Sequence, residues 1–295
     1  MSGRCVIVGD VMMDVTARIS SAIEYGSDTP ASVSVQAGGS AANTAAWLAS
    51  MGHAATFVGC VGDDAFGRDV LDVLESAGVD ARLAVCADRP TGTCVVIVDG
   101  RGERTMFPDK GANDTLDAGA VVAVGLASGD HVHLSGYVLL NPQTRQSGVR
   151  ILQHARSAGA TTSLDAASAG PLRQQRSNVL DVLDLVDILI ANEDEATALT
   201  GETDTTAALA RLAGLVPTAV VKRGSLGVLA RSGSTHVDQA ARQTAVVDTT
   251  GAGDAFAAGF LAAWLSGADP VDAVRDGQTL AAAAVGRVGA GPRGR

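Results

Sequence analysis

Aromatic residues are scarce in this 295-residue chain, because Phe, Trp and Tyr together make up only 3% of it. Proteins that bind single-stranded nucleic acid stack bases on aromatic side chains, and the chain has little material for such stacking. Apolar residues still reach 46% of the sequence. A large core must therefore be built from Ala, Val and Leu, and the length suits one large α/β unit.

Basic residues are also in deficit, with 22 Lys and Arg against 32 Asp and Glu and a net charge of −10. Acidic proteins bind nucleic acid and anionic membranes poorly, so we expect neither as a partner. The deficit does not exclude a phosphate ligand, because backbone amides can bind phosphate without basic side chains.

Cysteines are few, and long apolar runs and a Walker A loop are missing. The four Cys residues form no CxxC pair and no metal-ligand spacing, which is typical of reduced thiols in a cytosolic protein. No uncharged apolar run approaches the ~20 residues of a membrane span, and the first residues lack the plan of a signal peptide. No Gly-Lys pair occurs, which excludes a Walker A loop. We expect a soluble, cytoplasmic protein.

The chain does contain a regular alternation of short apolar segments and amphipathic ones. RCVIVGD near the start, ATFVGCVG from Ala55 and VDILIAN from Val186 are typical of buried strands. DDAFGRDVLDVLESAG, from Asp63, has the acidic first turn and the terminal glycine of a helix. Strands that alternate with helices predict an α/β fold with a mostly parallel sheet, and residues 1–295 are predicted to form a single domain.

Two segments, at about residues 14–37 and 92–110, interrupt this alternation. They combine alternating strand patterns with turn residues, and they are too long for plain loops. We predict that both contribute strands to a small separate sheet. Inserted near the strand ends of the core, this sheet would be well placed to act as a lid.

The stretch DTTGAGDAFAAGF, residues 248–260, has the clearest chemical pattern. The small apolar residues at its end predict a helix, which puts Gly251, Ala252 and Gly253 at a helix N-terminus. There the backbone N–H groups lack internal partners and the helix dipole favours negative charge. Glycine also lets the backbone approach an anion closely. These three residues are therefore a candidate cradle for a phosphoryl group.

Asp254 follows this cradle directly. A carboxylate would repel a bound phosphate unless its task is to take a proton from the hydroxyl that attacks that phosphate. The pairing is therefore the geometry of phosphoryl transfer to an alcohol. This stretch alone leaves an alternative open, in which Asp254 is an ordinary acidic residue in the first turn of a helix that follows a glycine turn.

Four ordered motifs resemble those of the ribokinase-like (PfkB) carbohydrate kinases. DTTGAGDAFAAGF looks like the C-terminal motif of that family, and AGGSAANTAAWLASMG followed by FVGCVGDDAFG looks like its N-terminal motif. NEDE at Asn192 and KRGSLG at Lys222 match the two motifs between them. The resemblance covers nearly the whole chain. It implies a three-layer α/β/α core with a small β-sheet lid, and an ATP-dependent carbohydrate kinase that uses Mg²⁺.

For the catalytic stretch, the resemblance implies that Asp254 takes the proton from a hydroxymethyl group of the sugar. The amides of Gly251, Ala252 and Gly253 would then stabilise charge on the transferring phosphoryl group. Asp248 and Thr250 match positions that, in many members, help to bind an activating monovalent cation, which would be K⁺. A neutral role in the core is the competing interpretation of the threonine.

Two further motifs are implied to bind the nucleotide. Asn192 and Glu195 match the Asn-x-x-Glu pair of the family, which acts near Mg²⁺ and the phosphates, largely through water. Without the family, the same residues would be a helix cap with an acidic first turn. Lys222, Gly224 and Gly227 lie in a loop that runs along the nucleotide in relatives, and a solvated lysine is the alternative for Lys222.

The N-terminal motif implies the acceptor side of the site. Asp14, rather than its neighbour Asp10, matches an aspartate that follows the first strand. A carboxylate can accept hydrogen bonds from two sugar hydroxyls at once. Gly38, Gly39 and Asn43 match the Gly-Gly and Asn that contact the sugar, although an Asn at the start of a helix is also an ordinary cap.

Three features bear on which acceptor is used. Arg104 lies on a predicted lid strand, where some relatives bind the carboxylate of an acidic sugar, and a solvated arginine is the alternative. Ser40 stands where ribokinases commonly have lysine, and Ser135, Gly136 and Tyr137 stand where they tend to have a glutamate. Both departures put ribose in doubt and leave a ketose, a deoxy-keto acid or a nucleoside open.

These residues predict an ATP-dependent kinase that phosphorylates a primary hydroxyl of a sugar or sugar-like molecule. A nucleoside kinase of the same family is the alternative. A non-catalytic sensor of sugars or nucleotides is the rival from another class, and it would have no need of Asp254. Because an inserted sheet leaves strand edges that need cover, we also expect a homodimer made through the lid.

Overall fold

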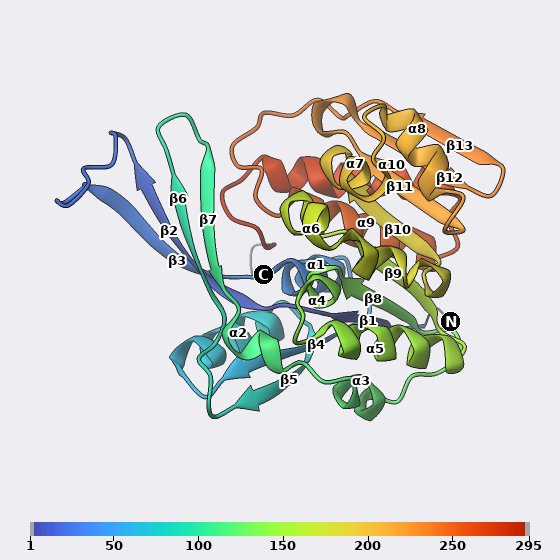
Figure 1. Ribbon diagram of the computed structural model, residues 1–295, viewed down its shortest axis with the longest axis horizontal. Helices are drawn as coiled ribbons and strands as arrows, with labels where there is room; N and C mark the ends of the chain where they lie inside the picture. Colours follow the sequence, from blue (N-terminus) through green and yellow to red (C-terminus); the bar gives the residue numbers. More distant parts are fainter. Residues whose placement is uncertain (1–2, 293–295) are drawn as a thin grey trace.

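The computed structural model describes residues 3–292. Its main sheet is built from β1 (Cys5–Val8), β4 (Ala55–Gly62), β5 (Asp80–Cys86), β8 (His131–Ser135), β9 (Thr161–Asp165), β10 (Ile188–Asn192), β11 (Thr218–Lys222), β12 (Val228–Ser232) and β13 (Thr235–Gln239). The spatial order of these nine strands is β13-β12-β11-β10-β9-β8-β1-β4-β5 (Figure 1). The pairs from β11 to β5 are parallel, whereas β12 and β13 form an antiparallel hairpin at one edge.

Several parallel strands, such as β1, β4 and β10, are apolar on both faces because both faces are covered. In β1, Val6 and Val8 pack into one core cluster, while Cys5 and Ile7 point to the opposite face and pack into another. Successive side chains of a strand point to opposite faces, so a strand with two cores must be apolar at every position. The run RCVIVGD is short and continuous for this reason.

Helices cover the two faces of the sheet as separate layers. One layer consists of α3 (Gly119–Val124), α4 (Tyr137–Leu140), α5 (Arg145–Ser157), α6 (Ala169–Leu180), α7 (Glu193–Thr200) and α8 (Thr205–Leu212), and the other of α1 (Ser40–Ser50), α2 (Ala65–Ser76), α9 (Ala252–Leu265) and α10 (Pro270–Val285). The predicted three-layer α/β/α core is confirmed. None of the helices in residues 3–292 combines the length and the apolar character that a bilayer span requires.

A second, four-stranded sheet stands apart from the main one, and Figure 1 shows it reaching away from the body of the molecule. Its strands are β2 (Met12–Ile19), β3 (Ala31–Gly38), β6 (Thr93–Val98) and β7 (Arg104–Asp109). The first pair follows β1 and the second pair follows β5, so both grow from the carboxyl ends of core strands. The predicted small sheet is therefore confirmed, and its action as a lid stays a prediction.

Polar residues gather where the parallel strands end. Asp10 follows β1 and Ser135 ends β8, while Asp165, Asn192 and Lys222 end β9, β10 and β11. Parallel strands bring their carboxyl ends to one edge of the sheet, which is where open α/β sheets bind ligands. The second sheet joins the core at this same edge.

Candidate active site

Asp254 lies in the first turn of α9 and is held by two side chains of α1. Its Oδ1 accepts a hydrogen bond from Ser40 Oγ at 2.8 Å, and its Oδ2 accepts one from Asn43 Nδ2 at 2.9 Å. The starts of α1 and α9 thus meet at one carboxylate, which is fixed in orientation. Asn43, predicted from the resemblance to contact a sugar, donates its amide N–H to Asp254, and its contact with a sugar stays a prediction.

The pKa of Asp254 is raised from its ordinary value of 3.8 to about 7. Burial is the largest cause, and the negative charge of Asp165 adds to it. The hydrogen bonds from Asn43 and Ser40, together with the positive charge of Lys222, act in the opposite direction. A carboxyl group with a pKa near 7 can accept a proton at neutral pH, which suits a general base.

The turn before Asp254 can be made only with glycine at its first position. Gly251 has a φ of +73°, and a Cβ there would lie 2.4 Å from the carbonyl oxygen of Ala290. No side chain caps α9, but the N–H of Ala252 donates to the carbonyl of Thr249 at 3.3 Å. One amide of the predicted three-residue cradle thus already has a partner. The next amides in the first turn are those that a helix leaves without an intrahelical acceptor.

Lys222 lies beside this turn, among carboxylates rather than in solvent. Its Nζ is 3.3 Å from Asp165 Oδ2, and a Cβ added to Gly253 would lie 3.2 Å from the same nitrogen. Burial alone would lower the pKa of Lys222, but the charges of Asp165, Glu195 and Asp254 raise it. Lys222 is therefore a fixed positive charge at the start of α9.

Asn192 and Glu195 form a complete capping box at the start of α7. Glu195 N donates to Asn192 Oδ1 at 2.9 Å, and Asn192 N donates to Glu195 Oε2 at 2.7 Å. The capping interpretation thus holds as local geometry. The same Glu195 is buried and interacts with Lys222 and Asp165, and burial raises its pKa to about 7 against the opposing charge of the lysine.

The two glycines after β11 have different surroundings. Gly227 has a φ of +98°, and a Cβ there would lie 2.0 Å from the carbonyl oxygen of Gln239, so the β11–β12 turn itself requires this glycine. Gly224 has a φ of +53° and nothing within 4 Å of an added Cβ. Of the two predicted nucleotide-loop glycines, Gly224 is the one that leaves space for a ligand.

Asp14 and the Gly-Gly pair are in close contact on the acceptor side. A Cβ added to Gly38 would lie 2.3 Å from Asp14 Oδ2, and one added to Gly39, with a φ of +98°, would lie 2.6 Å from the carbonyl oxygen of Asp10. The glycines let β3 and the start of α1 pack directly on the β1–β2 connection. Burial, with a contribution from the charge of Asp10, raises the pKa of Asp14 to about 6.

Asp10 belongs to a polar cluster that the sequence did not reveal. Ser135 Oγ donates to Asp10 Oδ1 at 3.3 Å, and Lys110 Nζ lies 3.9 Å from Asp10 Oδ2. The same Nζ is 4.2 Å from the ring centre of Tyr137. Because Asp10 acts on the pKa of Asp14, the cluster lies next to the predicted acceptor aspartate. Setting Asp10 aside on motif position alone missed this arrangement.

Arg104 on β7 contacts the loop that precedes α9. Its Nη2 donates to Thr249 Oγ1 at 2.7 Å, its Nη1 donates to Thr250 Oγ1, and Nη1 lies 3.5 Å from Asp248 Oδ1. The guanidinium is therefore engaged by the protein. The side chain is still partly exposed, at 32%, and binding of the carboxylate of an acidic sugar by Arg104 stays a prediction.

A cavity of about 280 Å³ lies between the small sheet and the loops at residues 246–250 and 288–290. Asp14, Thr16 and Arg18 of β2 line it. The cavity therefore joins the predicted acceptor aspartate to the segment that leads into Asp254. Its position under the sheet is the position expected for a small acceptor.

Comparison with known proteins identifies the family. A family model described as "pfkB family carbohydrate kinase" matches residues 2–293. The chain belongs to the PfkB family of carbohydrate kinases. An ATP-dependent ribose-1-phosphate kinase of Halopiger xanaduensis is 32% identical, over 97% of this chain and 93% of its own.

Solved structures of similar proteins agree with this assignment. The adenosine kinase of Sinorhizobium meliloti has a TM-score of 0.88 at 27% identity and covers 99% of this chain and 96% of its own. The ribokinase of Arabidopsis thaliana, solved with ribose and ATP, has a TM-score of 0.81 at 28% identity, with 98% and 95% covered. The resemblance inferred from four motifs is confirmed, and the protein is an ATP-dependent carbohydrate kinase by class.

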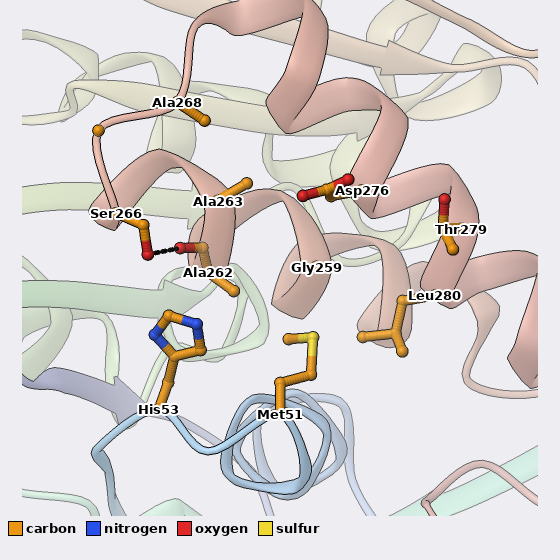
Figure 2. Close-up of a pocket in the computed structure, with 11 residues that line it drawn as sticks. Met51, His53, Gly259, Ala262, Ala263, Ser266, Ala268, Asp276, Thr279 and Leu280 are labelled. Atoms are coloured by element: carbon orange, nitrogen blue, oxygen red, sulfur yellow. Dashed lines mark hydrogen bonds between the residues drawn. The ribbon is translucent and has the colours of Figure 1, made fainter.

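A larger hollow of this PfkB kinase lies outside the site. It measures about 500 Å³ and is open to solvent between the end of α1 and the later parts of α9 and α10. Figure 2 shows Met51 and His53 on one side of it, with Ala262 and Leu280 opposite. Asp254 opens α9, whereas this hollow begins at Gly259 and continues beyond the end of the helix. It is separate from the candidate active site.

Two charged residues of the PfkB kinase site were missed by sequence reasoning. Asp165 pairs with Lys222, and Lys110 faces Asp10. A usable signal existed for Asp165, because it ends a predicted strand, as Asn192 and Lys222 do. Lys110 comes from the end of β7, and nothing in its neighbours along the chain points to Asp10.

Proposed function

We propose that this PfkB kinase transfers the γ-phosphoryl group of ATP to a primary hydroxyl of a sugar or sugar-like molecule, with Asp254 as the base that deprotonates the hydroxyl. The observation that carries the proposal is the Asp254 carboxylate, oriented by Ser40 and Asn43 and with its pKa raised to about 7. A residue that served only to favour a helix N-terminus would gain nothing from such burial, which costs stability when the group is ionised.

The residues around Lys222 suit the phosphates of ATP. Lys222 offers a positive charge, the first turn of α9 offers amides, and the absence of a Cβ at Gly253 leaves the amine of Lys222 unobstructed beside this turn. Within residues 3–292, no group of three or more His, Cys, Asp or Glu could hold a metal ion alone. Mg²⁺ would therefore enter with the phosphates and neutralise their charge, with Glu195 and Asp165 supplying hard oxygen atoms nearby.

The acceptor would bind in the 280 Å³ cavity beneath the small sheet. Asp14 lines this cavity and can accept hydrogen bonds from adjacent hydroxyls. We infer that the small sheet closes on the acceptor and excludes water, which would otherwise compete as a phosphoryl acceptor. We expect a cytoplasmic protein, since the phosphoryl donor is supplied there.

The nucleoside alternative is supported by the likeness to an adenosine kinase. A sugar phosphate with a free primary hydroxyl is supported by the ribose-1-phosphate kinase relative. One panel separates these acceptors: ribose, fructose, ribose 1-phosphate, 2-keto-3-deoxygluconate and adenosine, each with ATP and Mg²⁺. Release of ADP identifies the acceptor, and phosphorus NMR of the product gives the hydroxyl that is phosphorylated. Saturable binding without ADP release, for every acceptor, would favour the sensor and end the kinase proposal.

We also propose a homodimer formed through the small sheet. Val35, Val15, Val95 and Phe107 are neighbours in register across β3, β2, β6 and β7. They share one face, because Asp14 and Thr16 beside them in sequence line the cavity on the other face. Val35 and Phe107 are more than half exposed, at 51% and 55%. Exposed apolar surfaces of this kind usually mark a contact surface.

The dimer is tested with Val35→Glu, compared with Val271→Glu on the exposed side of α10. We expect sedimentation of the wild type and of V271E as dimers, and of V35E as a monomer. A wild-type protein that sediments as a monomer at micromolar concentration would exclude the contact.

A further inference from the structure

Two arginines of the small sheet reach the same carboxylate in the loop before α9. Arg104 of β7 has its Nη1 3.5 Å from Asp248 Oδ1, and Arg18 of β2 has its Nη2 3.5 Å from Asp248 Oδ2. Arg104 also donates to the hydroxyls of Thr249 and Thr250. The loop that leads into Asp254 is therefore tied to the small sheet by charged side chains.

The carboxylate of Asp248 is fully engaged by donors of the protein itself. Oδ1 accepts from the backbone N–H of Thr250 at 2.9 Å and from its hydroxyl at 2.5 Å, and Oδ2 accepts from Gly289 N–H at 3.3 Å. With the two guanidinium groups added, five donors surround one carboxylate. An ionised carboxylate has about four lone-pair positions, so no position remains for a further ligand.

The monovalent-cation site implied by the family resemblance does not fit this arrangement. K⁺ binds through oxygen atoms that replace its water shell, and the oxygens of Asp248 and the hydroxyl of Thr250 are already occupied. Two guanidinium groups within 3.5 Å of the carboxylate also repel a cation. Although burial alone would raise the pKa of Asp248, the bonds from Thr250 and Gly289 and the charge of Arg104 lower it.

We propose that Arg104 is a positioning residue that takes the place of a monovalent cation, and that this kinase therefore works without K⁺. The guanidinium neutralises Asp248 and fixes the two threonines that follow it. The backbone carbonyl of Thr249 in turn accepts a hydrogen bond at 3.3 Å from the N–H of Ala252, the first residue of α9. Arg104 thereby holds the turn that presents the amides next to Asp254. The planar fork of arginine suits a carboxylate and two hydroxyls better than the single point charge of a lysine.

The test compares KCl with tetramethylammonium chloride at equal ionic strength, on wild type, Arg104→Ala, Arg104→Lys and Arg101→Ala. Arg101 is the matched control, because it lies on the same hairpin but pairs with Asp99 at 3.1 Å. Thermal unfolding is measured first, without ATP or acceptor, and follows the fluorescence of the two tryptophans, Trp47 and Trp264. The rate of ADP release is measured second, and this arm alone rests on the proposed function.

We expect K⁺ to change neither the unfolding temperature nor the rate of wild type and R101A. In R104A the unfolding temperature falls in tetramethylammonium chloride and is restored by K⁺, and kcat falls at least tenfold and is partly restored by K⁺. R104K keeps the charge and stays independent of K⁺, with a smaller loss of kcat.

A several-fold activation of wild type by K⁺, or a K⁺-specific rise in its unfolding temperature, would overturn the inference. So would an R104A protein with wild-type stability and rate in tetramethylammonium chloride. If no acceptor is phosphorylated, the unfolding measurements still decide the inference, while the proposed function fails separately.

Discussion

Replacing Asp254 by Asn should make the protein more stable and almost inactive, and the gain in stability should depend on pH. The pKa of Asp254 is about 7 in the folded protein and 3.8 ordinarily. Below both values the group is protonated in both states and costs nothing. As the pH rises towards 7, the unfolded state loses this proton while the folded state keeps it, so folding becomes progressively less favourable. Above about pH 7 the group is ionised in both states, and the loss of folding free energy no longer grows.

The size of the effect follows from the same values. Each pH unit in this window costs about 1.4 kcal/mol per retained proton. In a comparison of pH 5 with pH 8, the folded state retains this extra proton only from pH 5 to its pKa of about 7, which is roughly two pH units. Since the side chain is only half-buried, solvent screening reduces the value, and we expect about 2 kcal/mol. An asparagine keeps an oxygen for the hydroxyl of Ser40, and a rotated Asn43 amide can accept from its new NH₂ group.

The assay is urea unfolding at pH 5 and pH 8, again followed by tryptophan fluorescence. The advantage of Asp254→Asn over wild type should be about 2 kcal/mol larger at pH 8 than at pH 5. Asp276→Asn, which also removes one negative charge but at an exposed position, should show no such difference. At pH 8 the activity of D254N should fall by a factor of roughly 10² to 10⁴, the usual contribution of a general base.

Three results would contradict this reasoning. An advantage of D254N that is the same at both pH values would mean that the folded protein does not shift the pKa of Asp254. A variant with near wild-type kcat would mean that another group takes the proton. Loss of activity together with loss of stability at both pH values would show disruption of the contact between α1 and α9 rather than removal of a base.

Three further predictions concern neighbouring residues. Because the charge of Lys222 lowers the pKa of Asp254, Lys222→Met should move the acid limb of the kcat–pH profile to higher pH, and an unmoved limb would contradict this. Ala167 has a φ of +73°, so Ala167→Gly should raise the free energy of unfolding by roughly 0.5–1 kcal/mol in a urea titration, whereas a loss would show that its backbone is unstrained. Gly38→Ala should raise KM for the acceptor more than it lowers kcat, since the new methyl group meets Asp14 at 2.3 Å, and an unchanged KM would remove Asp14 from the acceptor site.

The layered core was predictable because its signal is repeated many times along the chain. Several parallel strands, such as β1, β4 and β10, are short apolar runs, and most helices that follow carry an apolar stripe. The helix α6 is the exception, since Gln175 has non-helical φ and ψ angles within it and two helical pieces meet there. A periodicity of 3.6 residues cannot be read across such a break. The small sheet was predictable from the same logic, as the two places where the alternation stops.

Within the candidate site, the sequence could predict only those residues that lie in a short local motif. Asp254 has a local signal, because glycines precede it and a helix follows. Its partners do not, because Ser40 and Asn43 are more than 200 positions away in the chain. The same holds for Arg104, whose contacts with the loop before α9 depend on how the small sheet is packed against the core. Spacing along the sequence has no information on such contacts.

The charge balance around Lys222 connects the stability of this kinase to its chemistry. Asp165, Glu195 and Asp254 all act on this one lysine, so the cluster has more acidic groups than it can neutralise. Burial and this excess hold the pKa values of Glu195 and Asp254 near 7. A cluster selected for stability alone would be better served by one carboxylate, or by apolar residues of the same volume. In the proposed mechanism, the excess instead gives Asp254 a pKa high enough to accept a proton at neutral pH. The cost in folding free energy would then be a consequence of placing this base at the start of α9.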